Sequence, residues 1–373
     1  MDSKIYIILS NRKKIDTKIL NQRKIKESLI VVDIGTSSVK TSFFDLRGNI
    51  LPQFSISIPH SIISKNDGTS EQDAEFLRSV VEESIDLVLE KSEGYVENII
   101  GVGFDSMAST LLGINKYGNP ITPIYTYADT RSNSQVYKMK QDLNEKTLHQ
   151  ETGAAQHTSY IPSKIMWIKE NNNNYKDIDK FVDFSTFVYS KWFENKNFKA
   201  SYSISSWSGL LDRNKLQWHS DLIQYLGISE DKLPVLRPYE DYEKGLNKKY
   251  SKRWSKLTNT PFFLSIGDGM AASVGSGCSN RKKIAVTVGS TAAIRILVDS
   301  KVEEVPKGLW CYRLLHNYTL LGGSFSEGGN LINWAYNNLK LPKLENLSNE
   351  LFKLKPGTHG ISVLPFLLGE RAL

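Results

Sequence analysis

The sequence has little cysteine and no long apolar run. It contains only two cysteines, Cys278 and Cys311, among 373 residues. Two thiols without a secretory signal are typical of a reduced, cytoplasmic protein, so we expect free thiols rather than a disulfide or a metal site. The apolar runs, such as residues 28–34 and 284–288, have the length of a strand. A membrane crossing needs about 20 residues, so we expect no membrane partner.

Positive charge is also scarce outside one end of the chain. The net charge is +7, but residues 1–28 hold eight Lys or Arg against three acids, which leaves about +2 for the rest. A near-neutral body lacks the basic face that nucleic acid requires, so we expect no nucleic-acid partner. We interpret residues 1–28 as a flexible basic extension, and a targeting or docking tail is the alternative.

The most informative feature that is present is an internal repeat. Residues 31–45 (VVDIGTSSVKTSFFD) and 285–299 (AVTVGSTAAIRILVD) align without a gap. Each copy has an apolar strand, a glycine with hydroxyl residues, a second strand and a closing aspartate, which predicts a β-hairpin. The copies lie 254 residues apart. This spacing indicates two similar lobes and excludes a solenoid, whose repeats are far shorter.

Between the copies, helix and strand patterns alternate as in an α/β chain. A polar, Lys-rich stretch at 244–260 predicts a break between the lobes, which gives a first lobe over 29–255 and a second over 261–373. We expect strands at 98–104 and 261–266, and helices at 71–91, 143–153, 163–169, 183–193 and 220–226.

The second lobe is expected to be incomplete. Only 113 residues follow position 260, about half of what the first lobe occupies. They are expected to form the second hairpin, a helix at 328–339 and a last strand at 361–367. Because an apolar strand with no cover invites aggregation, we expect poor solubility and ATP binding no tighter than millimolar.

Several residues suit phosphate chemistry. Backbone N–H groups and hydroxyls in a glycine turn can cradle a phosphate. Asp33, at the end of the first strand, suits a magnesium ion that bridges nucleotide phosphates, and a turn-capping role is the alternative. Asp268, between two glycines, would cap a helix or accept the proton of an attacking hydroxyl. The turn residues are Gly35, Thr36, Ser37, Gly289, Ser290 and Thr291.

Taken in order, these and further motifs resemble the FGGY family of carbohydrate kinases, within the actin-like ATPase superfamily. The resemblance runs from about residue 29 to residue 373. It implies two ribonuclease-H-like α/β lobes, the second incomplete, that phosphorylate a sugar with ATP. The motifs are DIGTSSVKTSFFD, GTSEQD, NKYGNPITPIYTYADTRS, TGAAQHTSYIPSKIMWIKE, YSISSWSGLLD, GDGMAASVGSG, VGSTAAIRI and LPFLLGER.

The resemblance also implies site residues and cofactors. It gives Asp268 as the catalytic base, Asp33 as the acid of the magnesium site, and the two turns as cradles for the phosphates of ATP. In the YADTR segment it implies Asp129 and Arg131 as sugar-site residues. Asp129 can accept from sugar hydroxyls, and Arg131 can pair with a carboxylate or anchor Asp129. His157 falls near the sugar in gluconate-kinase-like members, and an exposed loop histidine is the alternative.

Gluconate is the expected substrate, because GLWCYR, SEGGNLINW and YADTRS look most like gluconate-kinase-like members. A pentulose or polyol kinase, or a non-catalytic sugar-binding remnant, are the alternatives. The sequence departs from the family at Ala108-Ser109, where many members have Met-His, and at its end, where members continue into a glycine-rich adenine-binding segment. A complementing C-terminal fragment or a second copy of the chain would then be a partner.

Overall fold

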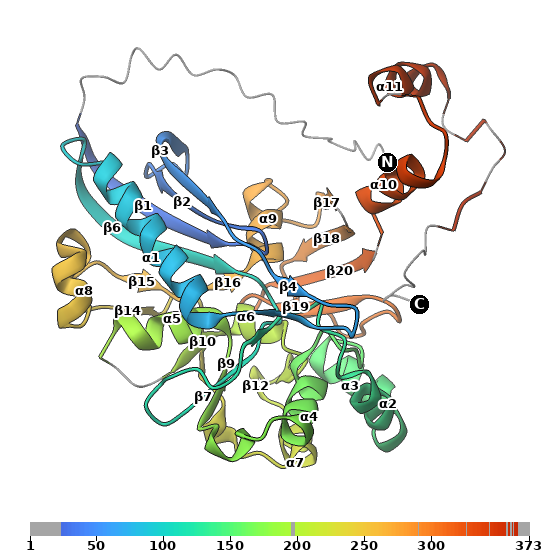
Figure 1. The fold of residues 1–373 in the computed structure, drawn as a ribbon, viewed down its shortest axis with the longest axis horizontal. Helices are drawn as coiled ribbons and strands as arrows, with labels where there is room; N and C mark the ends of the chain where they lie inside the picture. The colour runs from blue at the N-terminus through green and yellow to red at the C-terminus, as the bar shows by residue number, and fades with distance from the viewer. Residues whose placement is uncertain are drawn as a thin grey trace.

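The largest sheet forms around the first of the two repeated hairpins. The computed structural model describes residues 24–194, 198–289, 291–325, 327–342, 344–355, 357–358, 360 and 362–364. Strand β1 (Ile25–Ile34) pairs antiparallel with β2 (Ser38–Phe44), as predicted, and parallel with β6 (Val96–Ser106) (Figure 1). The strand order is β14-β15-β6-β1-β2-β3, and β16 also pairs with β6. The other strands are β3 (Ile50–Pro59), β14 (Tyr242–Glu243), β15 (Phe262–Phe263) and β16 (Ile266–Gly267).

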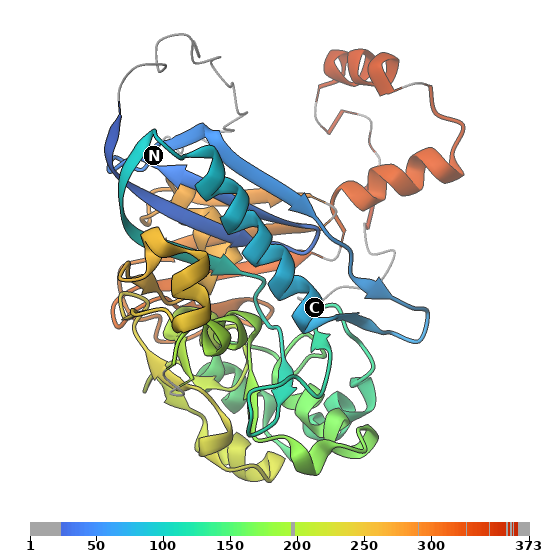
Figure 2. The same cartoon turned by 60° about the vertical axis from the view of Figure 1, so that its left-hand side comes forward.

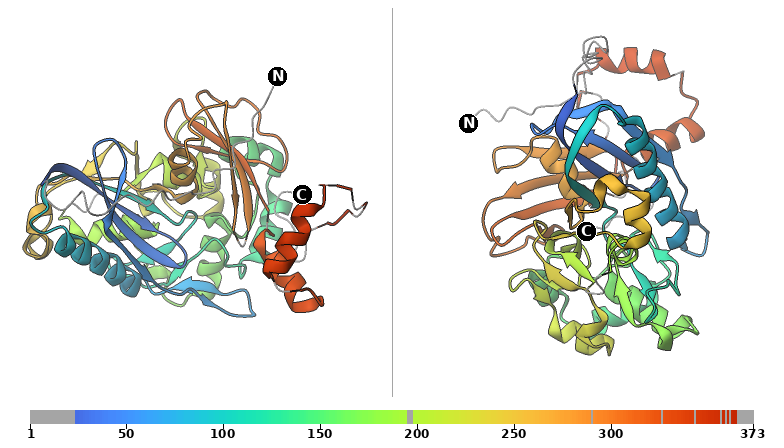
Figure 3. Two further views of the ribbon diagram at one scale, coloured as in Figure 1. Left: turned by 90° about the horizontal axis from the view of Figure 1, so that it is seen from above. Right: turned by 90° about the vertical axis from the view of Figure 1, so that its left-hand side faces the viewer.

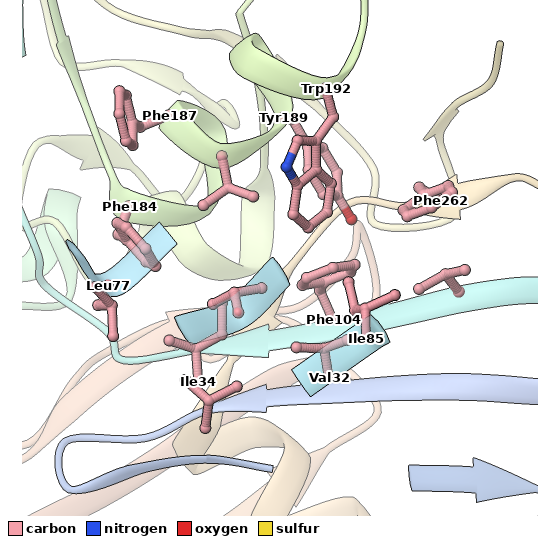
Figure 4. Close-up of a cluster of buried hydrophobic side chains, with 14 of the residues drawn as sticks. Val32, Ile34, Leu77, Ile85, Phe104, Phe184, Phe187, Tyr189, Trp192 and Phe262 are labelled. Atoms are coloured by element: carbon pink, nitrogen blue, oxygen red, sulfur yellow. The ribbon is translucent and has the colours of Figure 1, made fainter. Parts of the chain in front are cut away.

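Helices α1 (Ala74–Lys91) and α5 (Phe184–Trp192) cover one face of this sheet. Figure 2 shows α1 lying across the strands, and Figure 4 shows side chains of both helices packed on Val32, Ile34 and Phe104. Side chains alternate along a strand, so the residues between these, including Asp33 and Asp105, point to the opposite face. The core therefore occupies one side of the sheet and leaves the other side for polar groups.

The start of α1 differs from the predicted helix at 71–91. The Asp73 side chain accepts a hydrogen bond from the backbone N–H of Phe76, which caps the helix after residue 73. The preceding residues form strand β5 (Ser70–Gln72), which pairs with β4 (Ile63–Ser64) and β8 (Ile124–Tyr125).

The predicted break at 244–260 is wrong. This stretch forms α8 (Lys248–Arg253) and a short 3-10 helix (Ser255–Leu257), and Tyr250, Trp254 and Leu257 are buried in the core of the first sheet. The Tyr250 hydroxyl donates to buried Glu82 at 2.7 Å. The lysines of residues 244–260 are exposed to solvent. The stretch therefore looks polar in the sequence, although its apolar side chains pack in the core.

The predicted start of the second lobe at residue 261 also differs from the structure. Strands β15 and β16 pair with β6 and therefore belong to the first sheet. The second sheet begins at β17 (Ile284–Val288), which forms the second predicted hairpin with β18 (Ala292–Val298). Its strand order is β17-β18-β20-β19, with β19 at Trp310–Arg313 and β20 at Thr319–Phe325.

Helix α9 (Asp268–Gly275) connects the first sheet to the second. Helices α10 (Gly329–Asn338) and α11 (Leu344–Lys353) extend away from both sheets (Figure 3). Helix α10 corresponds to the helix predicted at 328–339. Of the strand predicted at 361–367, residues 362–364 are described and are not in a strand, and the others lie outside the described residues.

Most of the residues that lie between β6 and β15 in the sequence form a third region, which has its own hydrophobic core. The helices expected at 143–153, 163–169, 183–193 and 220–226 are all present, within three residues of the expected ends. The region's helices are α2 (Asn133–Asp142), α3 (Glu145–Thr152), α4 (Ile161–Asn171), α6 (Tyr202–Ser206) and α7 (Ser220–Leu226), with 3-10 turns at Tyr175–Asp177 and Glu230–Lys232. Its paired strands are β7 (Leu112–Ile114) with β9 (Lys180–Val182), β10 (Lys199–Ser201) with β13 (Val235–Arg237), and β11 (Leu211–Asp212) with β12 (Gln217–Trp218).

This third region docks closely on the second sheet through Gly153, which ends α3. Gly153 has φ +71°, and a Cβ there would lie 1.9 Å from the carbonyl oxygen of Cys311 in β19. The Cys311 N–H donates to the Gly153 carbonyl at 2.8 Å. Buried Arg213 donates to the backbone carbonyls of Val302 and Glu303. Backbone therefore meets backbone at this contact, and only glycine fits.

The N-terminal extension is shorter than predicted, whereas the two cysteines are as expected. Strand β1 begins at Ile25, so residues 25–28 belong to the sheet and not to the predicted extension, whose residues 1–23 lie outside the described residues. Cys278 and Cys311 are both buried and free, as predicted. Every helix in the described part of the chain is too short or too polar to cross a bilayer.

Replacing Trp254 with alanine tests whether 244–260 belongs to the first core. Trp254 is 1% exposed and packs edge-on against Trp192 at 4.9 Å. Trp254→Ala is expected to lower the free energy of unfolding by about 3–5 kcal/mol, because it leaves a large cavity. Urea unfolding measures the change, with Tyr117→Ala, at a position 74% exposed, as the control. A loss no larger than that of the control would place this stretch outside the core.

Candidate active site

Two aspartates stand side by side on the polar face of the first sheet. In the parallel pairing of β1 with β6, Asp33 is directly opposite Asp105. Lys40 of β2 also pairs with Asp33, with Nζ 3.3 Å from Oδ2. Burial, together with the nearby Asp33 and Asp268 carboxylates, raises the pKa of Asp105 to about 8. Asp105 was missed in the sequence, although it follows an apolar strand just as Asp33 ends one.

Asp268 joins this pair because β16 lies along β6. Ile266 is opposite Asp105 and Gly267 is opposite Ser106, so the next residue, Asp268, begins α9 at the same sheet edge. Its carboxylate accepts from the Gly269 N–H at 2.8 Å. Burial raises the pKa of Asp268, whereas the positive charge of Arg295 lowers it. The carboxyl is therefore more basic than an exposed aspartate.

The two glycines that flank Asp268 make room for an aromatic wall. A Cβ at Gly267 or Gly269 would lie 2.7 or 2.8 Å from the ring of Trp207. Trp207 in turn packs on Tyr312, with ring centroids 4.1 Å apart, and Tyr312 stacks on Trp310 at 4.7 Å. The motifs YSISSWSGLLD and GLWCYR contain these three rings, but nothing in the sequence indicated that Trp207 would meet Trp310 and Tyr312 of β19.

A cavity of about 920 Å³ brings the predicted groups together. Thr36 of the first turn and Thr291 of the second both line it, as does Asp268. The second turn is the tighter one, since Gly289 N donates to Thr291 O whereas Gly35 N donates to Ser38 O. Gly35 and Ser37 belong to the first turn and Gly289 to the second, and Ser290 lies outside the described residues. The two turns therefore face one space, as the duplication predicts.

Of the residues expected at the sugar site, one lines the cavity and two are not among its described lining residues. His157 lines the cavity, and its Nδ1 is 3.0 Å from the Ser159 hydroxyl. Asp129 and Arg131 are not among the described lining residues. The Arg131 guanidinium instead pairs with Asp129 and Glu71 and lies over the ring of Trp167. The structure thus brings His157 to the cavity and pairs Arg131 with Asp129, which is the anchoring role expected as one of two for Arg131.

Ser109 and Tyr127 also line the cavity. Ser109 occupies the position where the family resemblance led us to expect histidine, and it has φ +57°, a left-handed conformation that costs energy outside glycine. Its hydroxyl donates to the Trp207 carbonyl at 2.5 Å, which holds this strained residue against the aromatic wall.

The pair Asp33 and Asp105 fits a magnesium ion. Magnesium prefers oxygen ligands and is usually held by one or two carboxylates together with water and substrate phosphates. Among the described residues, no group of three or more His, Cys, Asp or Glu side chains could hold a metal by itself. Two adjacent carboxyls near the phosphate turn match the partial protein ligation that magnesium takes with nucleotides.

Comparisons with known proteins give the family of this chain. Residues 28–275 match the model of the FGGY family of carbohydrate kinases, N-terminal domain. A gluconokinase of Bacillus subtilis is 26% identical over 92% of this chain and 68% of its own length. A xylulose kinase of Lactococcus lactis is 23% identical over 91% of this chain and 67% of its own length.

Solved structures show the same fold. The gluconate kinase and the ligand-bound xylulose kinase of Lactobacillus acidophilus each superpose with a TM-score of 0.85 at 23% identity. Each comparison covers 93% of this chain and 70% of the other. The mixed α/β fold is therefore the actin-like ATPase fold of the sugar kinases, as the sequence predicts.

Asp105→Asn tests the buried carboxyl. In the folded chain the pKa of Asp105 is about 8, whereas the ordinary pKa of an aspartate is 3.8. The folded chain therefore binds more protons than the unfolded chain in this window, and the free energy of unfolding falls as pH rises from about 4 to 8. The variant is expected to lose this component and to be more stable than wild type at pH 8.

Urea unfolding in EDTA buffer between pH 5 and 8 measures the effect, with Asp299→Asn as the exposed control. Parallel pH dependences of wild type and Asp105→Asn would argue against a buried, protonated carboxyl.

Proposed function

Because the chain belongs to the FGGY family of carbohydrate kinases, we propose that it transfers the γ-phosphoryl group of ATP to a hydroxyl of gluconate. The observation that carries the proposal is the shared cavity, in which Asp268 and the two phosphate turns face one another. Substrate and phosphate donor can therefore meet at one carboxylate.

Asp268 is proposed as the general base. The substrate hydroxyl oxygen attacks the γ-phosphorus, and the bond between that phosphorus and the bridging oxygen breaks as the new P–O bond forms. ADP leaves with the electron pair, and the hydroxyl proton passes to Asp268. A raised pKa suits this role, because a more basic carboxylate accepts the proton more readily at neutral pH.

The two turns are proposed to bind the phosphates through backbone N–H groups and through the hydroxyls of Thr36 and Thr291. Gly328 packs directly on the second turn, since a Cβ there would lie 2.7 Å from the Thr291 carbonyl, and this contact fixes the turn. Asp33 and Asp105 would hold the magnesium ion, which neutralises charge on the phosphates when bound.

The sugar is proposed to lie against Trp207, with Ser109, Tyr127 and His157 as polar partners. Asp129 and Arg131 are proposed to position the Tyr127 loop, because their charges are already paired. The Asp129 carboxylate also accepts from the Ser70 N–H, which ties the loop to β5.

Two observations favour gluconate over a neutral sugar. The relatives of this chain include gluconokinases of two Bacillus species. Lys140 pairs with Glu145 at the cavity wall, and Lys146 and Lys307 line the cavity together with Glu304, so the two further lysines outnumber the acid beside them and attract a carboxylate. The similarity to xylulose kinases makes xylulose the alternative substrate.

A coupled ADP-release assay with gluconate, xylulose and glycerol tests the proposal. Gluconate is expected to give the highest kcat/KM. Comparable rates on gluconate and xylulose would contradict the choice of a sugar acid. No ADP release above background with any sugar, while the chain is folded and ATP with magnesium is present, would contradict the kinase proposal itself.

Asp268→Asn is expected to lower kcat by about 100-fold or more, because general-base catalysis contributes about 10²–10⁴-fold. Gluconate binding should change by less than about three-fold, since the lost role is in proton transfer. The same assay and a gluconate titration measure both quantities, with Asp299→Asn, whose side chain is 65% exposed, as the control. A variant that keeps a tenth of the rate would remove Asp268 from the mechanism.

A further inference from the structure

Arg295 occupies the cavity from the second sheet. It lies on β18, four residues after Thr291, and Ala293 and Arg295 both line the cavity. Alternate residues of a strand share a face, so the strand leads from the phosphate turn to this guanidinium. Arg295 is thus placed between the group that would bind phosphate and the proposed base.

The guanidinium lies directly against the first turn of α9. A Cβ at Gly269 would be 3.2 Å from Arg295 Nε, so the absence of a side chain at 269 admits the arginine beside Asp268. The two charges act on each other, since Arg295 lowers the pKa of Asp268. The Asp268 carboxylate nevertheless takes its hydrogen bond from the Gly269 N–H.

One donor of Arg295 lacks an acceptor. Nη1 donates to the Thr287 hydroxyl at 3.0 Å, but Nε is buried and has no hydrogen-bond partner in the structure. Burial of this cation is unfavourable and lowers the pKa of Arg295. A buried donor without a partner costs free energy, which an acceptor supplied by a ligand would recover.

The position next to Asp268 indicates which ligand supplies that acceptor. Asp268 takes the proton of the reacting hydroxyl in the proposed function, so any group beside it is at the reacting end of the sugar. The phosphoryl group must reach this point for the reaction to occur.

We propose that Arg295 binds oxygens of the phosphoryl group as it is transferred, and that it then holds the phosphate of the product. This inference rests on the proposed function. The planar guanidinium suits the role, because it can donate two parallel hydrogen bonds to phosphate oxygens. Donors placed where a transferred group passes stabilise the transition state without reorganisation. Arg295 would therefore act on the reaction directly, and it would keep Asp268 ionised as a second effect.

Binding without ATP separates this role from a general structural one. Trp207 and Trp310 lie in the cavity wall, so intrinsic tryptophan fluorescence can report ligand binding. The probes are gluconate and 6-phosphogluconate, with xylulose and xylulose 5-phosphate as the pair that lacks a carboxylate. Arg295→Gln is expected to weaken the phosphorylated ligand at least ten-fold and the free sugar less than three-fold. Arg295→Lys should weaken the phosphorylated ligand by an amount between wild type and Arg295→Gln. Arg281→Gln, which changes an exposed arginine, is the control.

Kinetics give a second readout. Arg295→Gln should lower kcat by about 10²–10³-fold, the loss typical of one transition-state donor, with little change in the KM for the sugar. The acid limb of its pH–kcat profile should move to higher pH, because Asp268 loses the cation that lowers its pKa. If Arg295 only supported the fold, Arg295→Gln would not shift the acid limb unless it also lowered the melting temperature.

Three results would overturn the inference. Equal weakening of sugar and sugar phosphate would show that Arg295 contacts the body or carboxylate of the sugar. Unchanged affinity for both would show that it contacts neither. If wild type binds neither the sugars nor their phosphates, the proposed function fails and takes this inference with it, an outcome that the wild-type titrations alone reveal.

Discussion

The pairing of β6 with neighbours on both sides is the interaction on which the rest of the site depends. On one side, β1 sets Asp33 opposite Asp105, and on the other, β16 delivers Asp268 to the same edge. Three carboxyls from residues far apart in sequence thus meet through backbone hydrogen bonds alone. A shift of one residue in either register would turn an aspartate into the apolar core, so the packing of Val32 and Phe104 also fixes the chemistry.

This arrangement places like charges together, and the structure offsets them in different ways. Asp105 is buried and holds its proton, Asp33 pairs with Lys40, and Asp268 receives a backbone N–H and the field of Arg295. Three side chains of the same chemistry therefore have three different environments. One is suited to proton transfer, and two are suited to a cation that arrives with the nucleotide.

Local sequence patterns predicted the parts of the site that are local. Both hairpins, their turns and the placement of Asp268 at the edge of a strand follow from contiguous residues, and the structure contains them. Asp105, Trp207 and Arg295 could not be found in this way, because their importance arises from strand pairing and from ring contacts across the chain. Arg131 is intermediate, since its motif predicted either a partner for a carboxylate ligand or an anchor for Asp129, and the structure pairs it with Asp129 and also with Glu71, 60 positions away.

The same reasoning explains the misplaced domain boundary. A stretch rich in lysine looks like a linker when charges are counted, but Tyr250 and Trp254 carry the burial while the lysine heads stay in water. A break at 244–260 would place the strand expected at 261–266 in the second lobe. Strand β15 instead lies between β14 and β6, with Phe262 opposite Val102, and so belongs to the first sheet.

The contact of Gly153 with Cys311 has a consequence for the width of the cavity. This contact is backbone on backbone and is reinforced by buried Arg213, so the end of α3 and strand β19 are joined directly. Any side chain at position 153 would meet the Cys311 carbonyl and push apart the two segments that carry His157 and Tyr312, so the width of the cavity depends on a glycine that does not itself line it.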